Sequence, residues 1–312
     1  MWARPATAQA RPATSSRSRT KVLDRALVLA LHRALLGSEA DLPASWACQG
    51  FTMRGSGLLV QHEGGPCGVL AAVQGFVVRE LGVAAGTGGA VLCADREKFG
   101  DALVGALSHI VWSARVGRLA SVVSCKRASL PALAESDGAL VSSECNSLDA
   151  VREAVRASAG SFVRPRGPGV AMLLYSVLLT RGVAMVARDA DFASALIMPN
   201  GYCAQELVNL LLVGRAHSNV FDGERVVGDG DGGDGCGGAR LRGIPRVAPI
   251  GFLTLFERQG DGGGVRREMK AHGGHTDPRA HRQASRAPSS ALGATSSGRR
   301  SAPLPSPSRP RG

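Results

Sequence analysis

The sequence has 312 residues, enough for one large domain or two small ones. Its formal net charge of +12 lies entirely in the two ends, because residues 1–21 carry five Lys or Arg and no acid, residues 260–312 carry a net +7, and residues 22–259 are neutral. A nucleic-acid-binding domain normally carries its basic patch on the folded body. The charge distribution therefore argues against specific nucleic-acid recognition and leaves the tails at most a salt-sensitive attraction to phosphates.

The seven cysteines are scattered and form no Cys-x-x-Cys pair, so the sequence predicts neither a zinc site nor a disulfide scaffold. Free thiols fit a reducing compartment, and we expect an intracellular protein of the cytoplasm or nucleus. The N-terminal "MWARPATAQARPATSSRSRTK" has the composition of an organelle transit peptide and equally that of a disordered tail. No apolar run approaches the roughly 20 residues that a membrane-spanning helix needs, so no membrane association is expected.

The first half of the chain reads as helices separated by irregular segments. Residues 1–21 are expected to be a disordered basic tail. In 22–37, leucines recur every four positions and Gly37 offers a stop, which predicts a helix. Trp46 and Phe51 then act as aromatic anchors, residues 58–60 resemble a short strand, and a helix is expected from Cys67 to Leu81 with Val69, Leu70, Val73, Phe76 and Val77 facing inward.

The second half continues this pattern. A Gly-rich loop over 82–90 leads to a helix over 95–115 and a strand over 119–125, and Ser147 is a candidate N-cap for a helix reaching residue 163. Apolar spacing predicts further helices over 169–190 and 204–214, a flexible loop over 228–238, and a helix start or strand over 250–257. Residues 260–312 lack the apolar residues that a folded segment needs and are expected to be disordered. The fold class is therefore α+β, mostly helical with a small sheet, over residues 22–259.

Cys67 is the main candidate for chemistry. It follows Gly64-Gly65-Pro66 at a predicted helix start, where unpaired backbone N–H groups and the helix dipole favour a thiolate and can stabilise an oxyanion. Gln61, across the tight turn, could aim an amide at the same place. The alternative is a plain buried thiol, and composition alone favours it. Cys203, His109 and His217 are interpreted as structural, and Asp229, Asp231 and Asp234 miss the calcium-loop spacing.

A resemblance bears on this choice. The stretch "LVQHEGGPCGVLAAVQGF" resembles the catalytic cysteine motif of the MINDY deubiquitinases, in the branch of the third and fourth members. "WACQGF", "LLYSVLLTR", "GYCAQELVNLLLVGRAHSNVFDG", "LRGI" and "IGFLTLFE" resemble further blocks of that branch in the same order. The resemblance covers roughly residues 46–257, with a weak middle.

The resemblance implies a papain-like cysteine isopeptidase that cuts ubiquitin from ubiquitin, with a preference for the chain linkage that marks proteins for the proteasome. By this resemblance Cys67 is the nucleophile and Gln61 the oxyanion-hole residue. Ubiquitin and polyubiquitin chains are the implied partners, and no metal or organic cofactor is implied. Residues 22–259 would then be the catalytic domain.

One part of the family pattern is missing. A general-base histidine is expected in a Ser-His-Phe strand after the block resembling "IGFLTLFE", and nothing of this kind follows Glu257. His272, His275 and His281 lie in Gly-, Pro- and Arg-rich context and do not match. Two explanations stay open: a truncated or mis-spliced gene model with an incomplete domain, or a relative that binds ubiquitin without cutting it.

Overall fold

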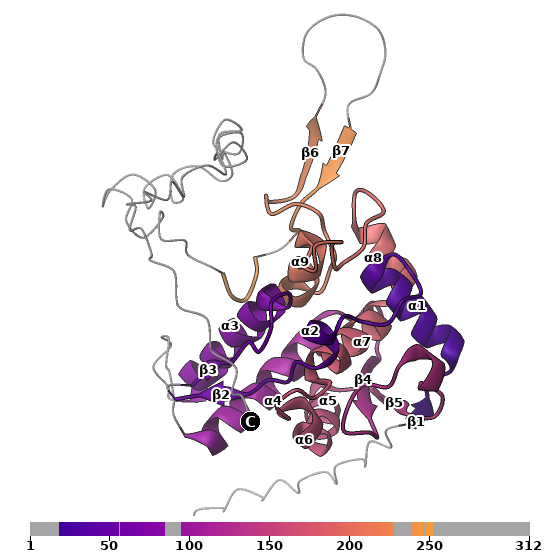
Figure 1. Ribbon diagram of the computed structural model, residues 1–312. Coiled ribbons are helices and arrows are strands. Elements are labelled where there is room, and N and C mark those ends of the chain that lie inside the picture. The colour runs from indigo at the N-terminus through magenta and orange to yellow at the C-terminus, as the bar shows by residue number, and fades with distance from the viewer. Residues whose placement is uncertain (1–18, 56, 85–94, 228–238, 246, 252–312) are drawn as a thin grey trace, which may run out of the picture. The chain divides into compact units, whose positions relative to one another are not determined.

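The protein is described by a computed structural model covering residues 19–55, 57–84, 95–227, 239–245 and 247–251 (Figure 1). The described residues form nine α-helices, and eight of them lie where the sequence has helical periodicity or a capping residue. The ninth, α2 (Ala44–Ala47), is a single turn around the buried Trp46. The expected loop at 228–238 and the tail at 260–312 lie outside the described residues. Of the segment 250–257, only residues 250 and 251 are described, and they have no regular secondary structure.

The first helix, α1 (Arg25–Leu36), follows the prediction closely. Asp24 caps its start by accepting a hydrogen bond from the Leu27 N–H, and Gly37 ends it in the left-handed conformation at φ +71°. The structure corrects the boundary before it, because the strand β1 (Arg19–Val22) begins inside the segment 1–21 that was expected to be disordered. All four residues of β1 are exposed, so no apolar alternation revealed this strand in the sequence.

The helices α3 (Cys67–Ala84) and α4 (Arg96–Ser113) lie side by side and confirm two predictions (Figure 1). All five residues expected on the inner face of α3 are buried, and so are Leu103, Leu107 and Val111 of α4. Asp95 caps α4 by accepting from the N–H groups of Glu97 and Lys98. The helix α3 continues to Ala84, into the segment expected to be a loop.

The helix expected over 169–190 is two helices. The chain bends by 83° between α7 (Gly169–Arg181) and α8 (Val183–Asp189), at Gly182 with φ +82°. Arg181 donates to both carboxylate oxygens of Asp189, at 2.8 and 2.5 Å, with both side chains buried, so the bend is closed by a bidentate ion pair. No single helix in the described ranges is long and apolar enough to cross a membrane; α7 and α8 together pass that test but for the bend.

The strands of the described residues form one small sheet and two hairpins. The three-stranded antiparallel sheet has the order β1-β5-β4, with β4 (Ala120–Cys125) confirming the predicted strand and β5 (Leu140–Cys145) missed by the sequence analysis. The antiparallel hairpins are β2 (Met53–Arg54) with β3 (Leu58–Leu59), and β6 (Glu224–Val227) with β7 (Ala239–Arg242). Short elements complete the described fold: η1 (Leu133–Glu135), α5 (Leu148–Ala157), α6 (Ala159–Phe162) and α9 (Gln205–Val213). Ser147 caps α5 as predicted.

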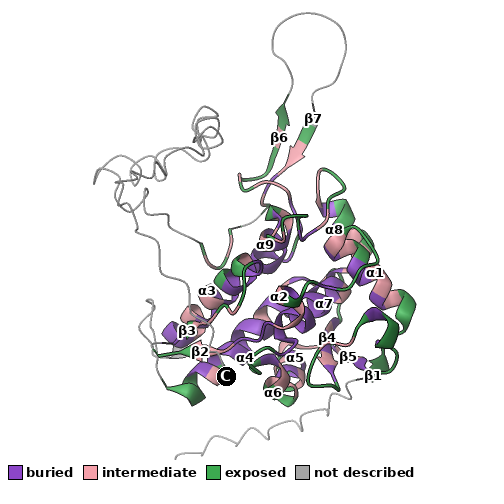
Figure 2. Cartoon of the chain, in the orientation of Figure 1, coloured by how far each residue is buried: buried purple, intermediate pink, exposed green. Residues whose placement is uncertain are grey.

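The helix α7 lies at the centre of the core and is buried along most of its length (Figure 2). It packs against the outer edge of the sheet, where β4 would leave backbone N–H groups unpaired. The Ser176 hydroxyl accepts from the Val123 N–H at 2.8 Å, and the Thr180 hydroxyl accepts from the Ser121 N–H at 2.9 Å. Four helical residues rise about 6.0 Å and two strand residues span about 6.6 Å, so hydroxyls four residues apart on the helix match alternate amides of the strand.

We expect Ser176→Ala to destabilise the fold by about 1–3 kcal/mol, because it leaves the buried Val123 N–H without its partner. The matched control is Ser108→Ala, since Ser108 is equally buried but its hydroxyl only donates to the Val104 carbonyl, within its own helix. Urea denaturation measures both free energies of unfolding. Equal losses in the two variants would contradict this explanation of how α7 holds the sheet edge.

Candidate active site

Cys67 is the first residue of α3, and its side chain is exposed. The Pro66 carbonyl accepts the first helical hydrogen bond, from the Leu70 N–H at 3.0 Å. The thiol lies at the amino end of an 18-residue helix, with its sulfur 3.7 Å from the Gly65 carbonyl oxygen. The predicted helix start is confirmed, and the alternative of a buried thiol is wrong for this residue. An exposed thiol at a helix amino end is accessible to a substrate and lies beside the first backbone N–H groups of the helix.

The Gly-Gly-Pro turn before Cys67 depends on Gly65. Its φ is +126°, and a Cβ there would lie 2.8 Å from Trp46 Nε1 and 3.0 Å from the Gly201 carbonyl oxygen. Those two groups are themselves joined, since Trp46 Nε1 donates to the Gly201 oxygen at 3.0 Å. Three segments far apart in the sequence therefore meet at the residue that leads into Cys67. This explains why Trp46 and the segment 201–203 accompany the cysteine motif in the sequence.

The loop that precedes the turn is held by Gln49, which is 1% exposed. Its amide nitrogen donates to the carbonyls of Gly50 and Val60, at 2.6 and 2.9 Å, and its carbonyl oxygen accepts from the His62 N–H at 2.9 Å. One side chain thus fixes the backbone on both sides of Gln61. In "WACQGF" the aromatic residues were the expected anchors, and this role of Gln49 was not predicted. A lone glutamine between apolar residues was the signal available.

Gln61 lies on the loop that precedes Cys67, and in the structure each side chain has a different hydrogen-bond partner. Its side chain is exposed, and its amide nitrogen donates to the Glu63 carbonyl at 2.7 Å. Glu63 in turn forms an ion pair with Arg166 at 3.2 Å. The oxyanion-hole role of Gln61 stays a prediction, and it requires the amide to leave Glu63 and turn toward the thiol.

A second thiol, Cys203, lies at the same helix end, which the sequence analysis did not predict. Its sulfur lies 4.0 Å from the Gly65 carbonyl oxygen, and a Cβ added at Gly68 would lie 2.9 Å from it. Burial raises the pKa of the Cys203 thiol, and the backbone N–H groups of Val69 and Gly68 partly offset this. These two N–H groups of the helix end therefore act on Cys203.

Three of the four described histidines contact other side chains. His62 contacts the Thr52 hydroxyl at 3.2 Å, the buried His32 contacts the Tyr175 hydroxyl, and His109 packs on Phe76, nine residues beyond Cys67 in α3. His217 is buried beyond the end of α9. His272, His275 and His281, like the three aspartates of the 228–238 loop, lie outside the described residues. In the described ranges no group of three His, Cys, Asp or Glu side chains is placed to hold a metal ion.

We expect Gly65→Ala to destabilise the protein by about 2 kcal/mol or more, because alanine is strained at φ +126° and its methyl would displace Trp46 or Gly201. The adjacent Gly64→Ala is the matched control, since a Cβ at Gly64 meets nothing within 4 Å. Chemical denaturation of both variants gives the comparison. If the two unfold at the same denaturant concentration, the close approach at Gly65 does not hold the turn.

Comparisons with known proteins identify the family. A family model described as the conserved domain of the deubiquitinating enzymes MINDY-3/4 matches residues 32–270. The chain is 37% identical over 255 residues to the "Probable ubiquitin carboxyl-terminal hydrolase MINDY-4" of Homo sapiens, and 34% identical over 250 residues to that of Xenopus tropicalis. It is 32% identical over 241 residues to the "Ubiquitin carboxyl-terminal hydrolase MINDY-3" of Homo sapiens.

These matches cover 76% of this chain for MINDY-4 and 67% for MINDY-3. The chain spans about a third of the length of the MINDY-4 relatives (33%) and about half of the MINDY-3 relative (52%). No solved structure matches the chain. Because the family model covers well over half of the sequence, and includes Gln61, Cys67 and Cys203, the chain belongs to the MINDY-3/4 family of deubiquitinating enzymes.

Proposed function

We propose that this chain is a cysteine-type deubiquitinase that hydrolyses the isopeptide bond between the C-terminal glycine of ubiquitin and a lysine amine. The observation that carries the proposal is the exposed thiol of Cys67 at the first residue of α3, in a chain of this family. The relatives named as ubiquitin carboxyl-terminal hydrolases support it. The preferred substrate is the chain linkage that directs proteins to the proteasome, cut inside the cell, in the cytoplasm or nucleus.

The reaction is that of a papain-like peptidase. The Cys67 thiolate attacks the glycine carbonyl carbon, and the tetrahedral intermediate places negative charge on the carbonyl oxygen. The Cys67 backbone N–H and the Gln61 amide stabilise that oxyanion. Collapse breaks the carbon–nitrogen bond, the lysine amine leaves with a proton, and a thioester joins ubiquitin to Cys67. Water then attacks the thioester, releasing the ubiquitin carboxylate and restoring the thiol.

The position of Gln61 suits this role after a local change. Its exposed side chain is held by one hydrogen bond to the Glu63 carbonyl, and Gln49 fixes the backbone next to it. A rotation of the side chain alone therefore brings the amide away from Glu63 and toward the reacting carbonyl. Because the backbone of this loop is already fixed, only the Gln61 side chain loses conformational entropy when the oxyanion hole forms.

The need for a proton donor distinguishes a hydrolase from a protein that only binds ubiquitin. The departing lysine amine must receive a proton when the carbon–nitrogen bond breaks. In the described part of the chain, neither His32, His62 nor His217 forms a hydrogen bond with Cys67. This observation motivates a second candidate function, a protein that binds ubiquitin chains without cutting them.

We expect a ubiquitin with an electrophile in place of its C-terminal carboxylate to label Cys67. Cys67→Ala should abolish labelling because the nucleophilic sulfur is gone. Cys203→Ala is the matched control and should keep it, since the pKa of the half-buried Cys203 is raised and its sulfur faces the helix backbone. Mass spectrometry of the adduct identifies the labelled residue.

Cleavage of di-ubiquitin of defined linkage distinguishes the two functions. Cleavage by the unmodified chain that Cys67→Ala loses supports the hydrolase. Binding of ubiquitin chains without labelling or cleavage would contradict the hydrolase and support the binding protein.

We expect Gln61→Ala to lower kcat for di-ubiquitin about 10²–10³-fold while leaving KM nearly unchanged, because an oxyanion donor acts only on the transition state. Steady-state kinetics at several substrate concentrations separates the two constants. A higher KM with the same kcat would show that Gln61 binds substrate and does not stabilise the oxyanion.

A further inference from the structure

A second polar site lies beyond the carboxyl end of α9, away from Cys67. It is a pocket of about 320 Å³ formed by the end of α7, by α8, by the segment after α9 and by the β6–β7 hairpin. Its charged and titratable lining residues are Arg181, Arg188, Asp189, Arg215, His217, Glu224 and Arg242. Nothing in the proposed deubiquitinase reaction uses these side chains.

His217 is the unusual member of the pocket. Its side chain is 6% exposed, and neither ring nitrogen has a hydrogen-bond partner among the described residues. The backbone carbonyl of Asp189 faces the ring closely enough to influence its protonation, without forming a hydrogen bond of acceptable geometry. An imidazole normally fills at least one of its two bonding positions when it is buried. A buried, unpartnered imidazole that lines a pocket indicates that a ligand supplies the missing partner.

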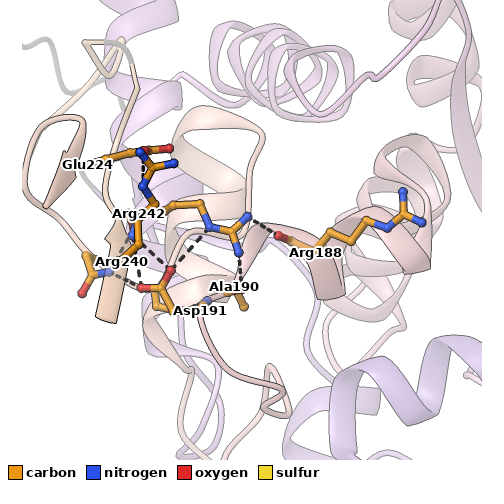
Figure 3. Close-up of polar contacts among 8 residues, drawn as sticks. Arg188, Ala190, Asp191, Glu224, Arg240 and Arg242 are labelled. Carbon is orange, nitrogen blue, oxygen red and sulfur yellow. Dashed lines mark hydrogen bonds and ion pairs between the residues drawn. The ribbon is translucent and has the colours of Figure 1, made fainter. Parts of the chain in front are cut away.

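Two of the four arginines are already neutralised. Arg181 forms the buried bidentate pair with Asp189. Figure 3 shows the second arrangement, in which Arg242 lies against Asp191 and donates to the carbonyls of Arg188 and Ala190. The remaining carboxylate of the lining, Glu224, pairs with Arg240 at 3.2 Å. Every carboxylate of the pocket therefore has an arginine partner.

The other two arginines carry uncompensated charge. Arg215 is exposed and forms no hydrogen bond or ion pair with the residues that the structure describes. Among the residues that the structure describes, the Arg188 guanidinium has one polar contact, a 4.0 Å approach to the Met185 sulfur, and Figure 3 shows its side chain extending away from Arg242. The pocket thus has an excess of two positive charges next to the unpartnered imidazole.

We propose that this pocket binds a phosphate group, either free or as the monoester of a phosphorylated side chain. A phosphate monoester carries close to two negative charges and three strong acceptor oxygens. Two uncompensated guanidiniums match that charge, and arginine is the side chain best suited to phosphate oxygens. The His217 ring supplies a further N–H donor from the buried side. A ligand with a single carboxylate would leave one of the two guanidinium charges unpaired.

The volume of the pocket is large enough for a phosphate monoester. At about 30 Å³ for each water molecule, the pocket corresponds to roughly ten waters, more than the five heavy atoms of a phosphate require. The spare room accommodates the carbon and backbone atoms next to a phosphorylated serine or threonine.

Binding should be linked to the protonation of His217. Burial lowers the pKa of this ring, as do the charges of Arg215 and Arg181, whereas the Asp189 carboxylate and carbonyl act in the opposite direction. A bound dianion raises that pKa, so binding takes up a proton. Affinity therefore rises as pH falls from the raised pKa of the bound state toward the depressed pKa of the free state. Arg188, Arg242 and Glu224 also line the pocket.

Isothermal titration of the full chain with inorganic phosphate, sulfate and a short phosphoserine peptide tests the proposal. We expect saturable binding, weakened roughly tenfold or more by Arg215→Gln because a charge-assisted hydrogen bond is lost. Arg118→Gln is the matched control, as Arg118 is an exposed arginine on a different part of the fold, and it should bind like the unchanged chain. Sulfate stays doubly charged over the range studied, so a rise in its affinity on acidification reports His217.

Two further variants test the role of His217 and of the second arginine. His217→Gln should remove the pH dependence for sulfate, and if that buried variant does not fold, Arg188→Gln serves as a second exposed test of the phosphate contacts. Tighter binding of the phosphopeptide than of phosphate identifies a phosphorylated side chain as the ligand, and equal binding identifies the free ion. Absence of saturable binding to all three probes, or equal affinity of Arg215→Gln and Arg118→Gln, overturns the proposal. Probe labelling of Cys67 should be unchanged in Arg215→Gln, so this result is independent of the proposed enzyme.

Discussion

The fold depends on a helix that has no exposed face. A helix buried on all sides cannot be oriented by amphipathicity, because its surface is apolar in every direction, so α7 is oriented by its few polar groups. Ser176 and Thr180 turn one side of the helix toward the amides of β4, and Arg181 turns its carboxyl end toward Asp189. These pairs fix the rotation of α7 and the position of the sheet edge. The helix α4, which supports α3, packs on this central element.

The candidate active site is positioned by residues that take no part in its chemistry. Gln49 holds the loop around Gln61, and Trp46 holds the turn before Cys67 through Gly65 and Gly201. Both side chains are buried, so their polar groups would be costly to leave unpaired. The loop is consequently preorganised before any substrate arrives, and Gln61 is the part of it that retains freedom. Cys203 completes the packing under the helix end without sharing the exposure of Cys67.

Local signals in the sequence predicted the elements that depend on local physics. Gly64, Gly65 and Pro66 marked the start of α3, and leucine spacing marked α1 and α4. The bend at Gly182 was missed because apolar residues continue on both sides of it, and β1 was missed because pairing with β5 alone makes it a strand. At the site, the resemblance selected Cys67 as the candidate nucleophile, but the orientation of Gln61 and the proximity of Cys203 depend on tertiary contacts. The pocket around His217 brings together distant segments and had no signature in any one of them.

The pairing of β1 with β5 also has a consequence for the order of events during synthesis. Lys21 and Glu144, which join these strands through an ion pair, are 123 residues apart along the chain. At a translation rate of about 5–20 residues per second, roughly 6–25 s pass before the second strand is made. During that interval β1 has no partner, and the basic character of Arg19 and Lys21 keeps this exposed edge from pairing with other chains. The charged strand thus protects the nascent chain until its own sheet can form.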